Sequence, residues 1–175
     1  VSGMAAATRY GILVKGGMFL EQGRLLGWLA LDKTGTITHG KPRQTDFVEI
    51  GDMGAYKTTA LAASIAARSD HPVSRAVAEN AAEQGIQTLD VAEFTALPGQ
   101  GVSGVIDGRK WYLGNHRMVE ELGHCSAELE SRIFDLEKTG KTVVALVGEK
   151  GVHALFAVAD TLKESSIEAV RELKK

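Results

Sequence analysis

Apolar residues in this chain follow two periods, and each period predicts a different kind of element. In the alanine-rich segment 55–68, Leu61 and Ile65 lie four residues apart, which is the spacing of one helix face. Further helices are expected at 1–9, 18–27, 72–84, 115–122 and 126–139, with a last helix whose buried stripe is Ile167, Val170 and Leu173. Short apolar or alternating runs predict strands at 10–17, 28–31, 45–50, 91–97, 102–106, 110–113, 142–147 and 152–158.

Glycine and proline mark the boundaries between these elements. Asp107-Gly108 is a strong hairpin signal, and residues 148–151 predict a second hairpin. Gly40 and Pro42 indicate an exit from a first domain, so we expect a hinge and a domain boundary near 41–43. Helices and strands mixed in this order predict an α/β chain.

One short stretch carries the clearest chemistry. The apolar run 29–31 leads into Asp32, and Lys33, Thr34, Gly35 and Thr36 follow at once. We expect a buried parallel strand that ends in a tight phosphate-accepting loop, with Asp32 at its carboxyl end. A carboxylate is an acceptable nucleophile for phosphoryl transfer when Mg²⁺ screens it and the phosphate. The alternative is an ordinary strand-to-helix turn with a capping aspartate.

Composition narrows the possible functions. The 175 residues are 44% hydrophobic and 24% charged with a net charge of -2, which is typical of a globular protein and gives no basic excess for nucleic acid. A single cysteine, Cys125, excludes an internal disulfide, and we expect it to be half-buried. His39, His116 and His124 share no metal-ligand spacing and are interpreted as surface residues, and His153 as an exposed strand position. No apolar run is long enough for a membrane span, and we expect no signal peptide.

A second candidate site begins at His71. Pro72 suits the first turn of a helix and would fix His71 at its N-cap, where the helix dipole favours a neutral imidazole that can lie against a purine ring. The alternative is a helix start without a ligand.

A group of glycines follows in the sequence. Gly99, Gly101 and Gly114 leave the backbone bare, and Asn115 can cap a helix or touch a ligand. For the glycines, simple hairpin chemistry is the alternative.

The motif Asp-Lys-Thr-Gly-Thr at 32–36 resembles the phosphorylation signature of P-type ion-pumping ATPases, whose phosphorylation domain belongs to the haloacid-dehalogenase superfamily. Phosphatases of that superfamily usually carry a second aspartate two positions after the nucleophile, where this chain has Thr34. A threonine cannot serve as that general acid and base. The aspartyl-phosphate is therefore expected to persist, as a pump requires.

Other motifs resemble the heavy-metal branch of these pumps. His71-Pro72, then Gly99, Gly101, Gly114 and Asn115, are similar to its nucleotide-domain pattern. The resemblance implies that His71 orients the adenine of ATP. It also implies that the glycines and Asn115 lie beside the adenine and ribose.

The resemblance implies an organisation in four segments. Residues 1–27 would be a membrane-proximal linker, and 28–43 with 157–175 would be parts of an incomplete Rossmann-like phosphorylation domain. Residues 44–156 would be an inserted α+β nucleotide-binding domain, an antiparallel sheet flanked by helices. Asp160 and Lys163 match a hinge motif of the family, with an N-capped helix start as the alternative.

The resemblance also implies a mechanism. ATP would phosphorylate Asp32, with Lys33, Thr34 and Thr36 steadying the phosphoryl group, and Mg²⁺ would be held by the Asp32 carboxylate and the backbone carbonyl of Thr34. The expected partners are the membrane and actuator domains of the same pump, at the cytoplasmic face of the membrane, and a heavy-metal ion bound outside this chain. The stretch 112–117 looks more like zinc, cadmium or cobalt pumps than copper pumps.

The chain departs from the family at two places. The family usually has a glutamate five residues before the motif histidine, where this chain has Ala66. Ser69 or Asp70 would have to substitute for it. Ala66→Glu is expected to tighten ATP binding relative to GTP.

The Thr-Gly-Asp and Gly-Asp-Gly-x-Asn-Asp loops of the family are absent from these 175 residues, so nucleotide binding without sustained turnover is expected. A stand-alone phosphatase with a cap domain and a regulatory nucleotide-binding module remain alternatives.

Overall fold

The computed structural model describes residues 2–174, which divide into two units at the junction of Asp32 and Lys33. The first unit contains α1 (Ser2–Arg9) and α2 (Gly17–Gly23). The helices predicted at 2–9 and 18–27 are therefore confirmed, although α2 is shorter than expected; residue 1 of the first prediction lies outside the described residues. The strand predicted at 10–17 is wrong, because residues 10–16 form a turn and irregular chain and Gly17 begins α2.

The strand predicted at 28–31 is not formed either. These residues have no regular secondary structure, and the Trp28 side chain is 95% exposed. A strand needs a neighbour that pairs with its N–H and C=O groups. No strand in the described part of the chain pairs with 28–31, so the apolar sequence alone does not produce one here.

The second unit is built on one antiparallel sheet. Within residues 33–174 six strands pair in the order β1-β6-β5-β4-β3-β2. Their bounds are β1 (Thr38–Glu49), β2 (Ala92–Leu97), β3 (Gly101–Ile106), β4 (Arg109–Gly114), β5 (Thr142–Gly148) and β6 (Gly151–Leu162). The predicted antiparallel sheet and both predicted hairpins are thereby confirmed.

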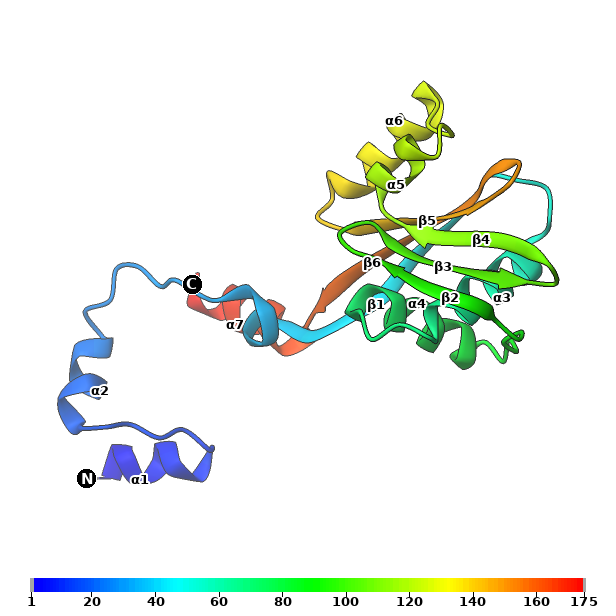
Figure 1. Ribbon diagram of the computed structural model, residues 1–175. Helices are drawn as coiled ribbons and strands as arrows, with labels where there is room; N and C mark the ends of the chain where they lie inside the picture. The colour runs from blue at the N-terminus through cyan, green and yellow to red at the C-terminus, as the bar shows by residue number, and fades with distance from the viewer. Residues whose placement is uncertain (1, 175) are drawn as a thin grey trace. The chain divides into compact units, whose positions relative to one another are not determined.

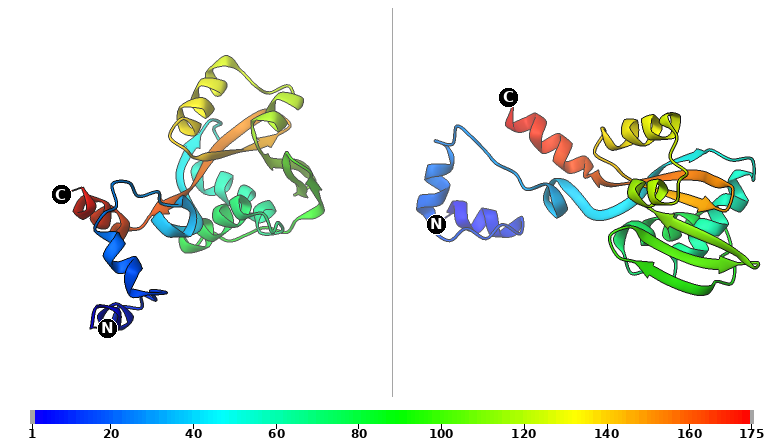
Figure 2. Two further views of the ribbon diagram at one scale, coloured as in Figure 1. Left: turned by 90° about the vertical axis from the view of Figure 1, so that its left-hand side faces the viewer. Right: turned by 45° about the horizontal axis from the view of Figure 1, so that its top comes forward.

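Helices cover both faces of this sheet (Figures 1 and 2). One face packs against α3 (Ala55–Ala66) and α4 (Pro72–Glu83), and the other against α5 (His116–Glu121) and α6 (Ala127–Glu137). All four helices were predicted.

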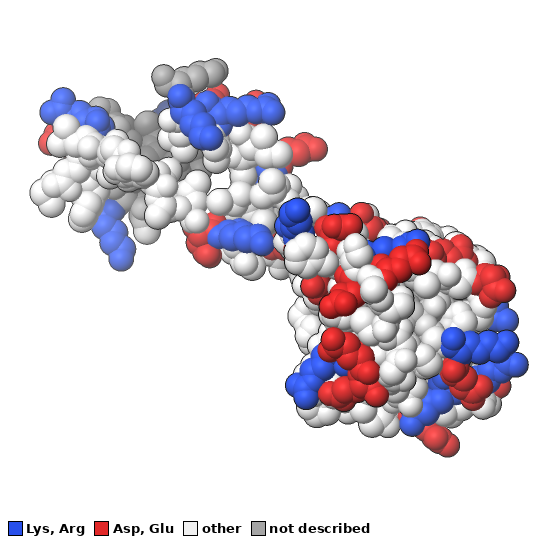
Figure 3. Space-filling view, turned by 90° about the horizontal axis from the view of Figure 1, so that it is seen from above, with Lys and Arg blue, Asp and Glu red and all other residues white. Residues whose placement is uncertain are grey.

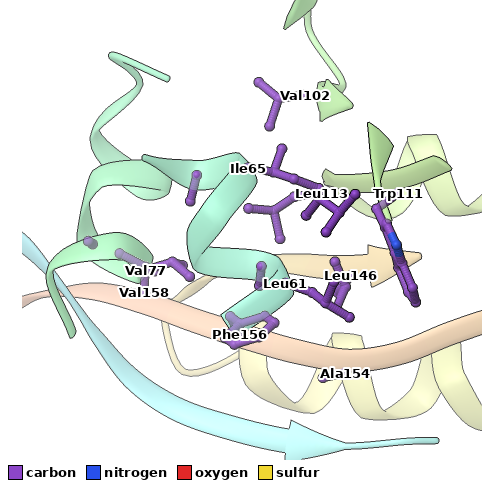
Figure 4. Close-up of a cluster of buried hydrophobic side chains, with 14 residues drawn as sticks. Leu61, Ile65, Val77, Val102, Trp111, Leu113, Leu146, Ala154, Phe156 and Val158 are labelled. Carbon is purple, nitrogen blue, oxygen red and sulfur yellow. The ribbon is translucent and has the colours of Figure 1, made fainter. Parts of the chain in front are cut away.

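Side chains of the central strands alternate between these two faces. On β6, Phe156 and Val158 join the cluster around α3 and α4, whereas Leu155 and Ala157 join the cluster around α5 and α6. Figure 4 shows the first cluster, in which Ile65 of α3 lies close to the sheet residue Leu113. Each fully buried large aliphatic side chain contributes about 1.5–3 kcal/mol. The two clusters are thus the main source of stability, and they fix the sheet that carries the site.

Strands β1 and β6 continue together beyond the rest of the sheet (Figure 1). Thr38 pairs with Leu162 and Pro42 with Asp160, with a register shift between them. The expected chain exit at 41–43 is therefore a position inside one continuous strand. The strand begins directly after an irregular turn, η1 (Lys33–Ile37).

The last helix, α7 (Glu164–Leu173), is formed as predicted, but the burial predicted for its apolar stripe is wrong. Ile167 is 41% exposed and Leu173 is 66% exposed, and none of the described residues of α7 is buried. The apolar stripe exists, but within the described chain it is not covered. An amphipathic pattern shows which face of a helix can be buried, and the covering partner is a separate requirement.

Charged side chains of both signs are scattered over the second unit (Figure 3). Several form exposed pairs one helical turn apart, such as Arg75 with Glu79 at 3.5 Å and Arg132 with Glu128 at 2.7 Å. Such exposed pairs contribute little to stability. None of the helices among residues 2–174 combines the length and the apolarity that crossing a bilayer demands.

Candidate functional site

A pocket of about 380 Å³ lies between the start of α4, the turn that follows β2, and strands β3 to β5. Its lining residues come from segments far apart in the sequence: Ser69, His71, Val73, Ser74, Ala96, Leu97, Pro98, Gly99, Gln100, Gly101, Val102, Leu113, Gly114, Asn115, Thr142 and Val144. Six of the seven residues expected to bind nucleotide therefore line one pocket. Pro72 is not among the lining residues.

His71 is fixed at the entrance to α4, as predicted. It occupies the N-cap with extended φ and ψ of -67° and 132°, and its Nδ1 accepts a hydrogen bond from the backbone N–H of Val73 at 3.3 Å. The hydroxyl oxygen of Ser69 accepts a hydrogen bond from the His71 N–H at 3.2 Å. An accepting Nδ1 carries no proton, so the neutral ring carries its proton on Nε2.

Asn115 fastens the turn after β2 to the start of α5. Its Oδ1 accepts a hydrogen bond from the Met118 N–H at 3.2 Å, and its Nδ2 donates to the Gly99 carbonyl at 2.9 Å. The backbone N–H of Asn115 also donates to the Gln100 carbonyl at 2.8 Å. Of the two roles left open for Asn115, the structure thus shows the helix cap, and the same contacts shape one wall of the pocket.

The three glycines of the pocket are required for different reasons. Gly101 and Gly114 face each other across the β3–β4 pair, and a Cβ on Gly101 would overlap the Leu113 carbonyl and the Cα of Gly114. Gly99 has a φ of +72°, and a Cβ there would meet open space among the described residues. The close approach of β4, together with a φ of +151°, explains Gly101, and a Cβ on Gly114 would overlap the Gln100 carbonyl and the Met118 side chain. The backbone conformation alone explains Gly99.

A second group of contacts surrounds η1, the turn that directly follows Asp32 in the sequence. Gly35 has a φ of +76°, and its N–H donates to the Thr38 hydroxyl at 3.2 Å. The Thr38 hydroxyl in turn donates to Asp160 Oδ2 at 2.5 Å, and Asp160 Oδ1 accepts the Gly40 N–H at 3.0 Å. The Asp160 carboxylate therefore holds the chain on both sides of His39.

Lys163 holds the same turn from the other side. Its Nζ donates to the Gly35 carbonyl at 2.7 Å and to the Thr36 carbonyl at 3.3 Å. The alternative in which Asp160 caps α7 is wrong, because Asp160 lies in β6 and Lys163 occupies the N-cap position without a side-chain cap bond. Lys163 thus contacts the turn after the candidate nucleophile directly, whereas Asp160 contacts the start of β1, where the Thr38 hydroxyl also accepts the Gly35 N–H.

Several single-residue predictions need correction. His153 is half-buried rather than exposed, with its ring centroid 5.2 Å from that of Trp111, because β6 is covered on both faces. His116 and His124 are also partly buried, and His116 Nε2 lies 3.1 Å from Cys125 Sγ. Cys125 itself is half-buried as expected.

Ala66 requires a larger revision. It is 0% exposed within the core cluster on the α3–α4 face, and it is not a lining residue of the pocket. A glutamate at this position would place a carboxylate in apolar surroundings, which costs several kcal/mol unless it is paired. Ala66→Glu is therefore expected to destabilise the chain rather than simply to improve ATP binding.

Sequence reasoning missed several residues of these sites, among them Thr38, Thr142 and the pocket residues Ser74 and Gln100. Thr38, which is fully buried and joins the turn η1 to Asp160, follows the Asp-Lys-Thr-Gly-Thr motif by only two positions, and that proximity was the available signal. Thr142 lines the pocket from the start of β5, and no local pattern marks it.

Comparison with known proteins identifies the class to which this fold and site belong. The haloacid dehalogenase-like hydrolase family matches residues 28–175, so the chain belongs to that family. This match confirms the predicted superfamily, whose Asp-centred motif precedes η1.

The relatives within this class are metal-transporting P-type ATPases. The chain is 38% identical to the probable copper-transporting ATPase PacS of Synechococcus elongatus, over 99% of this chain and 23% of that protein. It is 34% identical to the probable cadmium-transporting ATPase of Alkalihalophilus pseudofirmus, over 99% of this chain and 25% of that protein. These matches confirm the resemblance to the heavy-metal branch.

A solved structure gives the same result. The crystal structure of a zinc-transporting PIB-type ATPase in the E2.Pi state superposes with a TM-score of 0.88 and 32% identity, over 99% of this chain and 28% of that chain. The chain thus spans about a quarter of the length of the relatives that it matches.

Proposed function

We propose that this chain is the ATP-handling part of a heavy-metal P-type ATPase, in which ATP bound in the pocket phosphorylates Asp32. The observation that carries the proposal is the assembly of His71, Gly99, Gly101 and Asn115 around one pocket. These residues lie on three separate segments, and they were selected from sequence motifs alone. The pocket volume of about 380 Å³ falls within the range of small-molecule sites.

The pocket suits the base and ribose rather than the phosphates. Among residues 2–174, those that line it include no Lys or Arg that could neutralise a triphosphate. Apolar walls such as Val102 and Leu113 can contact a flat base, and the neutral ring of His71 can stack on it. The phosphates would therefore extend beyond the residues that line the pocket.

In the proposed reaction a carboxylate oxygen of Asp32 attacks the γ-phosphorus. The bond between that phosphorus and the β–γ bridging oxygen breaks, ADP leaves, and an aspartyl-phosphate forms. Lys33 would supply charge to the transferring phosphoryl group, and the hydroxyls of Thr34 and Thr36 would donate hydrogen bonds. Because position 34 is a threonine, this chain offers no carboxylate there to activate water.

Mg²⁺ fits the donor atoms that the motif offers. Mg²⁺ prefers oxygen ligands and usually takes one or two carboxylates together with phosphate oxygens and water. Residues 2–174 contain no group of three or more His, Cys, Asp or Glu arranged for a metal, which agrees with a site that relies on nucleotide oxygens. Asp32 and the backbone carbonyl of Thr34 would hold the ion, which would neutralise phosphate charge.

We further propose the context of a complete pump. Residues 28–43 and 157–175 would belong to the phosphorylation domain, 44–156 to the nucleotide domain and 1–27 to a linker toward the membrane. The partners would be the membrane and actuator domains, at the cytoplasmic face, and the transported ion would bind outside this chain. Relatives named for copper, cadmium and zinc all match, so the preference for zinc, cadmium or cobalt over copper stays a prediction.

Calorimetry of MgATP binding to the 175-residue chain tests the nucleotide site. His71→Asn keeps a side chain that can cap α4 but removes the imidazole, and we expect at least tenfold weaker binding, about 1.4 kcal/mol. The matched control is His39→Asn on β1, which is outside the pocket and should leave the affinity within twofold. Equal affinities for wild type and His71→Asn would contradict the assignment.

Turnover tests the chemical part of the proposal. We expect the isolated chain to bind ATP without sustained hydrolysis, because the family loops that complete the phosphorylation site are absent from these residues. Phosphate release would be measured over hours, with Asp32→Asn as the control. Steady hydrolysis that disappears in Asp32→Asn would show that this chain alone forms and discharges the intermediate, contrary to the prediction.

A further inference from the structure

We propose that the pocket binds purine nucleotides without selecting adenine over guanine. The inference rests on the proposed nucleotide site and adds the class of base that it accepts. It follows from the hydrogen-bonding groups that the pocket offers. Selection between two purines requires groups that can only donate or only accept, placed against the edge of the base.

Charged side chains can only donate or only accept hydrogen bonds, and the described residues that line the pocket include none. Among the described residues, those that line it include no Asp, Glu, Lys or Arg. Ala66, the position at which the family usually has a glutamate, lies in the core. No carboxylate of the lining residues can therefore accept a hydrogen bond from the adenine amino group or repel the O6 oxygen of guanine.

Several of the neutral amide and carbonyl groups of the pocket, which can only donate or only accept, already form hydrogen bonds within the protein. Both ends of the Asn115 amide are used, by the Met118 N–H and the Gly99 carbonyl. The carbonyls of Leu97 and Gln100 already accept hydrogen bonds from Gln100 and Asn115 respectively. Three carbonyls of the turn that forms one side of the pocket, those of Leu97, Gly99 and Gln100, thus already accept hydrogen bonds from within the protein.

The side chain of Gln100 is only half engaged. Its Nε2 donates to Glu121 Oε2 at 2.7 Å, so its amide oxygen remains able to accept. A single neutral hydrogen bond changes affinity by about fivefold. Gln100 therefore sets an upper limit on the base preference that we expect.

The remaining polar groups suit both purines. The hydroxyls of Ser69, Ser74 and Thr142 line the pocket, and each can rotate its proton to donate, or accept on its oxygen, although the Ser69 oxygen already accepts the His71 N–H. They can thus match the amino group and N1 of adenine as well as O6 and the N1–H of guanine. His71 presents an Nε2–H, and the N7 acceptor that it could meet is common to both bases.

Calorimetry of the complete 175-residue chain with MgATP, MgGTP and MgCTP tests this inference, and adenosine and guanosine repeat the comparison without phosphates. We expect ATP and GTP to differ by less than fivefold. We expect CTP to bind at least fivefold more weakly than either, because a pyrimidine has less stacking area and no N7.

The outcomes separate the inference from the proposal on which it rests. A preference of fivefold or more for either purine would overturn the inference and leave a nucleotide site. Equal binding of CTP would show that the pocket does not recognise purines, and would overturn it as well. Absence of binding by all three nucleotides would refute the proposed function itself, and the inference with it.

Discussion

The nucleotide pocket and the turn after Asp32 are built by opposite means. The pocket lies on a sheet whose two faces are both buried, and its shape is set by main-chain contacts, helix caps and the absence of side chains at Gly101 and Gly114. The turn η1 has almost no apolar support. It is held by polar contacts: Lys163 donates to its carbonyls from both Nζ and the backbone N–H, and the Thr38 hydroxyl, which is bound to Asp160, accepts the Gly35 N–H. Lys163 lies more than 120 residues later in the sequence than this turn.

This difference indicates which part of the site can be rigid and which can move. The core strands that form part of the pocket wall change shape only when the core is disturbed. A turn that has no buried residue of its own and is held by polar contacts can be released at smaller cost. Such a division would suit the proposed function, in which the nucleotide stays bound while the segment around Asp32 changes conformation.

The largest effect is expected from a matched pair of glycine substitutions in the pocket. In Gly101→Ala the new Cβ would overlap backbone atoms of Leu113 and Gly114, which cannot rotate away, so we expect a loss of about 3 kcal/mol or more in unfolding free energy. In Gly99→Ala the methyl group meets open space, and only the positive φ opposes it, at about 1 kcal/mol.

Urea denaturation of both variants would measure this difference directly. Both substitutions add the same methyl group, at positions two residues apart that both have a positive φ, so composition cannot explain a gap between them and the overlap at Gly101 can. Equal losses of stability would mean that β3 and β4 separate easily. The conclusion that the pocket is rigid would then be wrong.

A smaller and more local effect is expected in the turn. Asp160→Asn removes the charge that accepts hydrogen bonds from the Thr38 hydroxyl and the Gly40 N–H. We expect about 1–2 kcal/mol of local destabilisation, seen as roughly tenfold faster amide hydrogen exchange at Gly40. MgATP affinity should stay within twofold, because Asp160 is outside the pocket.

Asp135→Asn on α6 is the matched control for this experiment. Asp135 lies on an exposed part of its helix, and its replacement should leave exchange at Gly40 unchanged. If Asp160→Asn weakened MgATP binding tenfold without unfolding the chain, the turn and the pocket would be coupled. The conclusion that the pocket and the turn behave independently would then be wrong.

The same comparison explains what could be predicted from the sequence. Local signals succeeded: Asp107 and Gly108 both have positive φ, as their hairpin requires, and His71 caps α4 beside its proline. Features that depend on a residue or strand far away in the sequence were predicted wrongly or were not predicted. The run 28–31 has strand-forming residues but no pairing strand among those described, and the contact of Thr38 with Asp160 joins residues 122 positions apart.

The smallest effect is expected in the pH dependence of stability. It comes from His153, which is half-buried on the same sheet as the pocket. Burial lowers the pKa of His153 below its ordinary value of 6.5, although the nearby Asp52 acts in the opposite direction. The unfolded chain therefore binds a proton more readily than the folded chain does. Stability from this residue is fully present above pH 6.5 and is lost as the pH falls from 6.5 through the folded pKa.

Urea midpoints at pH 7.5 and 5.5 would measure this loss, with His153→Gln as the variant that cannot titrate. We expect the fall in midpoint between the two pH values to be smaller in His153→Gln than in wild type, and smaller than the effect of Gly101→Ala. Other groups titrate equally in both chains, so the difference between them isolates His153. An identical fall in both chains would mean that the histidine takes up its proton in the folded sheet as easily as in water. The sheet at this position would then be open to solvent, and its rigidity would not extend beyond the pocket.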